Sequence, residues 1–182
     1  MLPIKGRLSM DKKFVFLASL FLIVSFSAGV FTEIAVPSEK MMISTELPGL
    51  AASLADYIKS DIITILAAMI FSALFFLMPL VILMVIGKTF SLGFTAAYIL
   101  SSLEEKGFSL VIAALLPRGL FKLPAYIALI IVSYETAKFV RKNYHNPAAL
   151  KGIKPHLFHF LFCLAALIVS SILETFLLQI VL

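Results

Sequence analysis

The sequence predicts an all-α, polytopic transmembrane helical bundle, and three observations carry this prediction. Hydrophobic residues make up 62% of the 182 residues and charged residues only 14%, whereas ordinary globular proteins are about half apolar and a quarter charged. The mean hydropathy of +1.09 is equally unlike that of a soluble chain. Long apolar stretches recur along the chain, and one small core could not bury them all, so they require a bilayer. We therefore expect one integral membrane domain over residues 14–182, after a basic cytoplasmic N-terminus of residues 1–13.

Five segments have the composition of membrane spans. They cover residues 14–36, 62–86, 89–103, 108–140 and 157–182. The first resembles a signal peptide, but its apolar run is longer than such peptides carry, so we expect an uncleaved anchor. The second has no charge, and Pro79 is expected to kink it. Residues 37–61 remain as the only sizeable external loop.

The third and fourth segments are irregular. Residues 89–103 would form a helix only about 22 Å long. Gly93 and its small neighbours suit close packing of this helix against another. The fourth segment is long enough to span, but Pro117 and Pro124 interrupt it. We therefore expect the third and fourth segments to pack together around this break.

The distribution of charge predicts the orientation. If the chain crosses five times, ten of its fifteen basic residues fall on one side: Lys5, Arg7, Lys12, Lys13, Lys88, Lys138, Arg141, Lys142, Lys151 and Lys154. The positive-inside rule then places the N-terminus in the cytoplasm and the C-terminus outside a cell membrane. The net charge of +5 follows from this topology. We expect the chain to contact membrane lipid, anionic lipid included, and no nucleic acid.

The segment from Pro117 to Pro124 is the most unusual part of the chain. Its two prolines bracket Arg118, Gly119 and Lys122 in the middle of a hydrophobic region. Irregular backbone at membrane depth must pack within protein or line a wet cavity, and a buried cation is usually paired. One interpretation is a discontinuous helix that forms a site or docks a partner. The other is a break near one interface, from which both cations reach lipid headgroups.

Glu174, in the last span, also has two interpretations. It is either an acid at the outer interface or the ion-pair partner of Arg118 or Lys122, clamping the last helix to the broken one. His156 and His159 have a spacing that could hold a metal, but a third ligand is missing nearby, so we expect interfacial histidines. HExxH, CxxC, GxSxG and Walker patterns are absent from the sequence. We therefore expect no catalytic residues, no enzyme activity, no metal and no cofactor.

Three stretches together resemble the stage II sporulation protein M family. They are Gly87–Thr95, Leu116–Ala125, and Ser171–Glu174 within the last hydrophobic helix, and the likeness extends over essentially the whole chain from Phe14. Many family members carry His and Glu in the broken segment, at the positions that Arg118 and Lys122 occupy here. This departure argues against proton or metal chemistry at that segment.

The resemblance implies a function that composition does not. It implies a membrane scaffold that anchors and localises two cell-wall hydrolases, stage II sporulation proteins D and P, at the septum during engulfment. In a spore former it would lie in the mother-cell membrane. The alternative is a small oligomeric transporter or permease-like subunit with a site at the broken helix around Arg118. The sequence is also compatible with homo-oligomers.

Overall fold

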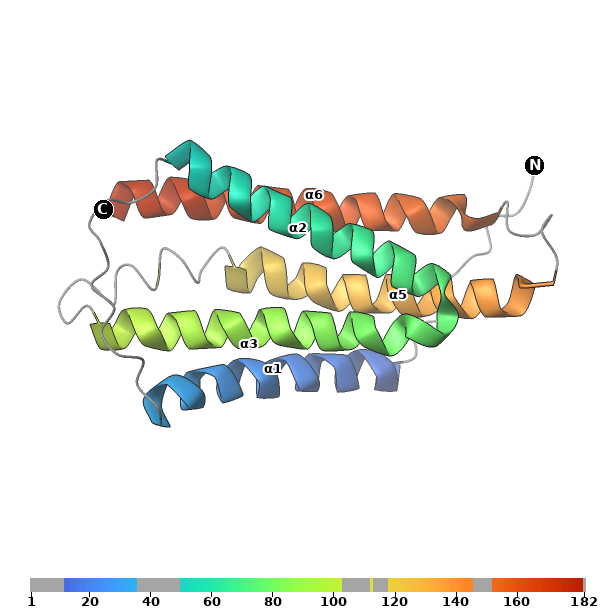
Figure 1. Ribbon diagram of the computed structural model, residues 1–182, viewed down its shortest axis with the longest axis horizontal. Helices are drawn as coiled ribbons and strands as arrows, with labels where there is room; N and C mark the ends of the chain where they lie inside the picture. Colours follow the sequence, from blue (N-terminus) through green and yellow to red (C-terminus); the bar gives the residue numbers. More distant parts are fainter. Residues whose placement is uncertain (1–11, 36–49, 103–111, 113–117, 146–151, 182) are drawn as a thin grey trace.

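The described part of the protein is a bundle of long antiparallel helices (Figure 1). The computed structural model describes residues 12–35, 50–102, 112, 118–145 and 152–181, and these contain no strand. The helices are α1 (Lys12–Ala35), α2 (Leu50–Ala73), α3 (Met78–Ser102), α5 (Leu123–Asn143) and α6 (Lys154–Val181), with short turns η1 (Phe75–Leu77) and η2 (Arg118–Lys122). The predicted all-α helical bundle is confirmed.

Successive helices run in opposite directions along the bundle. In Figure 1, α1 and α6 begin at one end of the bundle, and α6 finishes at the other. Within the described residues, four helical stretches are long and apolar enough to cross a membrane: Lys12–Ala35, Phe75–Tyr98, Gly119–Asn143 and Lys154–Leu177. Helix α2 is not among them, and Asp56, Lys59 and Asp61 lie in its first half. The protein is therefore a multi-pass helical membrane protein, and α2 differs from the four apolar stretches in the three charged residues of its first half.

The predicted spans 62–86 and 89–103 are wrong as boundaries. The chain reverses direction inside the first of them, because α2 ends at Ala73 and α3 begins at Met78. The backbone amide of Leu77 donates to the carbonyl oxygen of Leu74 at 2.7 Å within this turn. The turn is made of apolar residues, so hydropathy alone could not separate the two helices.

Pro79 has a different role from the predicted kink. It is the second residue of α3, where the amide that proline lacks would have no partner within the helix. The helix then continues through Gly93 to Ser102 without interruption. Pro79 therefore marks the beginning of a helix.

Two further predictions change with these boundaries. Helix α2 begins at Leu50, so its first residues belong to the bundle and not to an external loop over 37–61. Residues 37–49 of that loop lie outside the described ranges. Lys88 was expected in a cytoplasmic loop, but it lies within α3.

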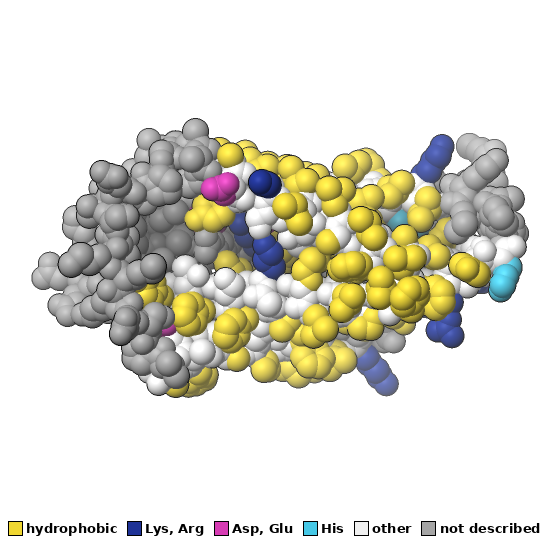
Figure 2. Space-filling model, in the orientation of Figure 1, with side chains coloured by type: hydrophobic (Ala, Val, Ile, Leu, Met, Phe, Trp, Pro, Cys, Tyr) yellow, Lys and Arg dark blue, Asp and Glu magenta, His cyan; other side chains and the backbone are white. Residues whose placement is uncertain are grey.

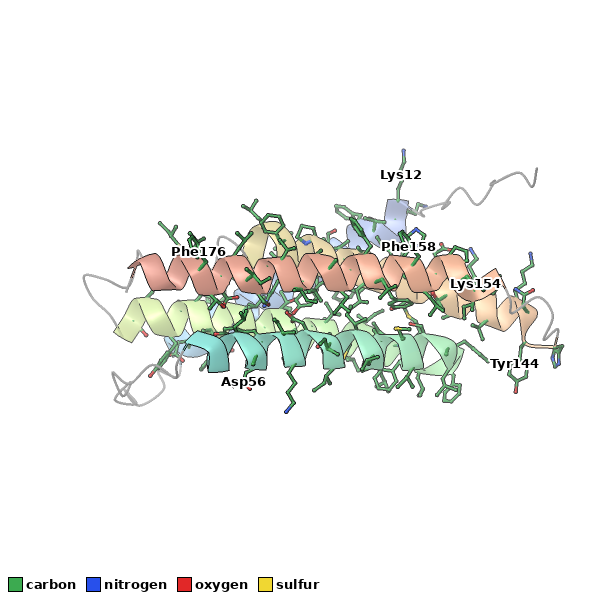
Figure 3. The ribbon with its side chains drawn as sticks, turned by 90° about the horizontal axis from the view of Figure 1, so that it is seen from above. Lys12, Asp56, Tyr144, Lys154, Phe158 and Phe176 are labelled. Carbon is green, nitrogen blue, oxygen red and sulfur yellow. The ribbon has the colours of Figure 1, made fainter. Side chains whose placement is uncertain are left out.

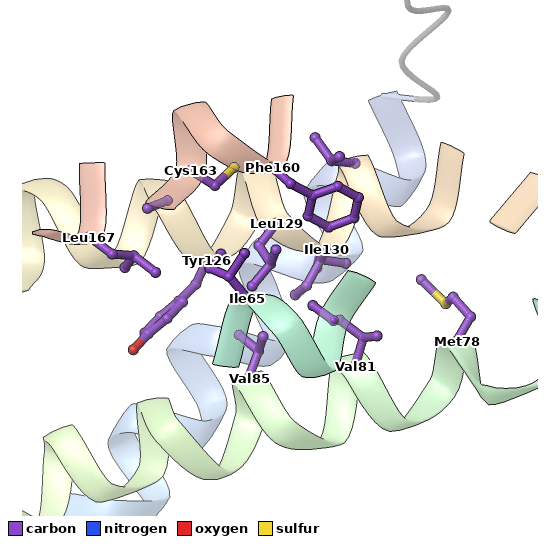
Figure 4. Packing of buried hydrophobic residues seen from close by; sticks show 14 of the residues in the cluster. Ile65, Met78, Val81, Val85, Tyr126, Leu129, Ile130, Phe160, Cys163 and Leu167 are labelled. Carbon is purple, nitrogen blue, oxygen red and sulfur yellow. The ribbon is translucent and has the colours of Figure 1, made fainter. Parts of the chain in front are cut away.

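The core of the bundle lies between α2, α3, α5 and α6 (Figure 4). It contains Ile65, Val81, Val85, Leu129, Ile130, Phe160 and Leu167, all less than 4% exposed. Most described side chains on the face shown in Figure 2 are also hydrophobic. Phe158 and Phe162 on α6 are 70% and 71% exposed, as expected for side chains that face hydrocarbon.

Helix α1 packs along α3 through an interface of small residues, which we call the α1–α3 seam (Gly29, Gly93 and Ser25). A Cβ atom added to Gly93 would overlap the backbone carbonyl of Phe26. One added to Gly29 would overlap the carbonyl of Phe90. The Ser25 hydroxyl donates to the backbone oxygen of Ile86 at 2.7 Å. The two backbones therefore approach as closely as glycine allows.

Candidate functional site

The irregularity predicted between Pro117 and Pro124 is a π-helical turn. This turn, η2, leads directly into α5, and such turns are frequent at functional sites. Pro124 lies in the first turn of α5, where it initiates the helix. Pro117 and the side chain of Arg118 lie outside the described parts, and Gly119 is exposed with open space around it.

Three buried charged side chains meet at this turn, and we call them the ion cluster (Asp61, Lys122 and Glu174). The Lys122 Nζ atom lies 3.6 Å from Asp61 Oδ2 and 3.6 Å from Glu174 Oε2. The side chains are 6%, 4% and 0% exposed for Lys122, Asp61 and Glu174. The Ser171 hydroxyl donates to Asp61 Oδ2 at 2.8 Å. The cluster thus joins α2, the turn η2 and α6.

The ion cluster decides between the two interpretations of Glu174. An acid at the membrane surface would be exposed, whereas Glu174 is fully buried and paired with Lys122. Lys122 is likewise buried and does not extend toward lipid headgroups, and its Nζ lies 5.4 Å from the centre of the Tyr57 ring. Removing one member of such a buried group leaves an uncompensated charge. The cluster therefore links the turn η2 to α2 through Asp61 and to α6 through Glu174.

Sequence reasoning missed Asp61, because that residue fell at the end of the expected loop. Recognising one helix over Leu50–Ala73 would have revealed it. Asp61, Ile65, Ala68 and Ser72 recur at helical spacing, and all four are buried. Asp61 is thus part of the inward face of α2.

A pocket of about 280 Å³ adjoins the ion cluster between α2, α3 and the start of α5. It is lined by Tyr57, Ser60, Asp61, Lys88, Ser91, Leu92, Thr95, Lys122 and Tyr126. The Lys88 ammonium donates to the Ser60 hydroxyl at 2.5 Å. Figure 2 shows basic side chains recessed between helices on a face whose described side chains are mostly hydrophobic. The bundle therefore carries a polar pocket partway along its length.

The remaining candidates lie apart from this site. Figure 3 shows Lys154 and Phe158 toward one end of α6 and Phe176 toward its other end. Asp56 of α2 lies at the same end of the bundle as Phe176. His156 packs against the Phe139 ring, with centroids 5.3 Å apart, and His159 Nδ1 lies 2.6 Å from the oxygen of Pro155. Among the described residues, no three His, Cys, Asp or Glu side chains are grouped so as to hold a metal ion. Gly93 belongs to the α1–α3 seam.

Comparison with known proteins gives one match. The chain matches the family model of stage II sporulation protein M over residues 14–177. No curated protein and no solved structure matches it. The matched region contains the α1–α3 seam, the ion cluster and the pocket, together with nearly all of the described helices. The match covers most of the sequence and agrees with the helical membrane architecture, so the chain belongs to the stage II sporulation protein M family.

Proposed function

We propose that this protein is a membrane scaffold that anchors and localises peptidoglycan-degrading enzymes at the septum during engulfment. Family membership carries the proposal, and with the four apolar helices it indicates a sporulation-related, non-catalytic membrane protein. The partners would be stage II sporulation proteins D and P, and the location the mother-cell membrane.

The exposed helix faces support docking of partner helices. Phe16 and Phe31 on α1 are 70% and 68% exposed, and Phe176 on α6 is 60% exposed. In a bilayer, helices associate through van der Waals packing and a few hydrogen bonds, because lipid tails are as apolar as leucine. Helices α1 and α6 thus offer exposed aromatic side chains to a partner helix.

In the proposed orientation, the ion cluster lies on the side of the membrane that faces the peptidoglycan, where the enzymes would act. The basic residues at the ends of the described helices gather where α1 begins and α5 ends: Lys12, Lys13, Lys138, Arg141, Lys142 and Lys154. The positive-inside rule makes that end cytoplasmic. The ion cluster then lies in the outer half of the bundle, toward the peptidoglycan.

Fusions at the two termini test this orientation. We expect a C-terminal alkaline phosphatase fusion to be active and an N-terminal one inactive, because this enzyme folds only outside the cytoplasm. A fluorescent-protein fusion at each terminus serves as the reciprocal control. Active phosphatase at both ends would contradict an odd number of crossings.

Affinity purification tests the scaffold. The N-terminally tagged protein is extracted from its native host with a mild detergent, and co-purifying proteins are identified by mass spectrometry. We expect cell-wall amidases or lytic transglycosylases to be enriched over a tagged multi-pass membrane protein of similar size. Deleting the gene should abolish septal localisation of those enzymes, and unchanged localisation would refute the scaffold.

Transport is the alternative, and the polar pocket beside the turn before α5 is the observation that favours it. A transporter would give a solute flux in proteoliposomes that Arg118→Ala abolishes. Flux no greater than in empty liposomes would count against transport.

A further inference from the structure

Lys88 is a cation well inside a helix that is apolar enough to cross a membrane. It is the eleventh residue of the 25-residue α3, about 15 Å from the start of that helix. Its ammonium donates to the neutral hydroxyl of Ser60. Asp61 and Glu174 both pair with Lys122, and within the described part of the chain no carboxylate lies within ion-pair distance of Lys88. A charge at this depth is costly without a counter-charge.

The acid that lines the same pocket does not supply that counter-charge. Asp61 Oδ2 accepts a hydrogen bond from Ser171 and lies 3.6 Å from Lys122. Its charge is thus compensated within the ion cluster. Lys88 also lines the pocket, and within the described residues its ammonium has one polar partner, the Ser60 hydroxyl.

The rest of the pocket is also suited to an anion. Ser60 on α2 and Ser91 on α3 are among its lining residues and carry hydroxyl groups, whereas the Thr95 hydroxyl donates to the backbone oxygen of Ser91. Lys122, the last residue of η2, and Tyr126 on α5 complete this side of the lining. The volume of about 280 Å³ exceeds what a single carboxylate needs.

We propose that this pocket binds the phosphate group of an anionic membrane lipid, with Lys88 as its counter-charge. The pocket lies between helices whose neighbouring side chains face hydrocarbon, such as Ile63 on α2 and Leu83 on α3, which are 56% and 61% exposed. Acyl chains of a lipid held by its phosphate would cover such residues. Inorganic phosphate carries the same kind of anionic oxygen atoms, so the experiment must distinguish free phosphate from the phosphate group of a lipid.

Lipid binding to the purified full-length chain tests the proposal. The delipidated protein is titrated with phosphatidylglycerol or phosphatidylcholine, and bound lipid is counted by native mass spectrometry. Both lipids carry the phosphate anion, but phosphatidylcholine also carries a quaternary ammonium group that Lys88 and Lys122 repel. We therefore expect phosphatidylglycerol to bind roughly tenfold more tightly. Lys88→Met should remove this preference, and Lys88→Arg should retain it. Lys59→Met is the matched control, because Lys59 is exposed and does not line the pocket.

The outcomes separate the lipid from its alternatives. An unchanged preference for phosphatidylglycerol in folded Lys88→Met protein would overturn the proposal. Lys88-dependent competition by millimolar inorganic phosphate, without any lipid preference, would replace the lipid with the free anion. If Lys88→Met does not fold, Ser91→Phe fills the pocket without changing its charge, and wild-type lipid binding by that variant would also overturn the proposal.

Discussion

The α1–α3 seam and the ion cluster hold helices together in opposite ways. At the seam, Gly29 and Gly93 lack the side-chain atoms that would keep the two backbones apart. At the ion cluster, long charged side chains reach one another across three elements, with both lysine–carboxylate distances at 3.6 Å. In a bilayer the hydrophobic effect does not distinguish lipid from a neighbouring helix, so close packing and polar pairing must do this work. The seam should be sensitive to added atoms and the cluster to a lost charge.

Lys122→Met should give the largest effect, because it removes the buried cation that pairs with both Asp61 and Glu174. We expect the free energy of unfolding in mixed micelles to fall by about 3–5 kcal/mol. Lys59→Met, at an exposed site, should change it by less than about 0.5 kcal/mol.

The same cluster offers a rescue. Lys122→Met combined with Asp61→Asn and Glu174→Gln removes all three charges and should recover most of the lost stability, since neutral replacements of buried ion groups are often tolerated. If Lys122→Met alone unfolds like wild type, or if the triple variant is no better than the single one, the electrostatic account of the cluster is wrong.

Gly93→Ala should give an intermediate effect, because its new Cβ meets the backbone of Phe26, which cannot move aside as a side chain would. We expect a loss of about 1–3 kcal/mol in the same unfolding assay. Gly87→Ala is the matched control in the same helix, where nothing lies within 4 Å of an added Cβ. It should be neutral or stabilise by up to about 1 kcal/mol, because alanine favours helix. Equal effects at the two positions would show that the seam is loosely packed.

Ser25→Ala should give the smallest effect. It removes the hydrogen bond from α1 to the Ile86 carbonyl of α3, and such bonds between membrane helices contribute about 0.6 kcal/mol. Thr32→Ala removes a bond within α1, to Ala28, and should not loosen the seam. A disulfide-trapping assay between α1 and α3 distinguishes the two variants. If Ser25→Ala lowered the free energy of unfolding by more than about 2 kcal/mol, the seam would depend mainly on this hydrogen bond and not on close packing.

The sequence was most informative where the signal is local. Long apolar stretches identified the membrane domain, and Gly93 was recognised as suited to close packing. The Lys122–Glu174 pair was among the hypotheses because both charges stand out in apolar surroundings. The turn between Ala73 and Met78 was missed, since apolar residues on both sides of it gave the appearance of one continuous span.

Membrane character, helical class and family membership follow from the amino-acid sequence by itself, because composition and motif order are properties of neighbouring residues. The partners of Asp61 were decided only by the tertiary structure. Its hydrogen bond from Ser171 joins residues 110 positions apart, and no local pattern specifies which faces of α2 and α6 meet. That choice depends on how all the helices pack, and it brings three scattered charges together beside a polar pocket in the bundle.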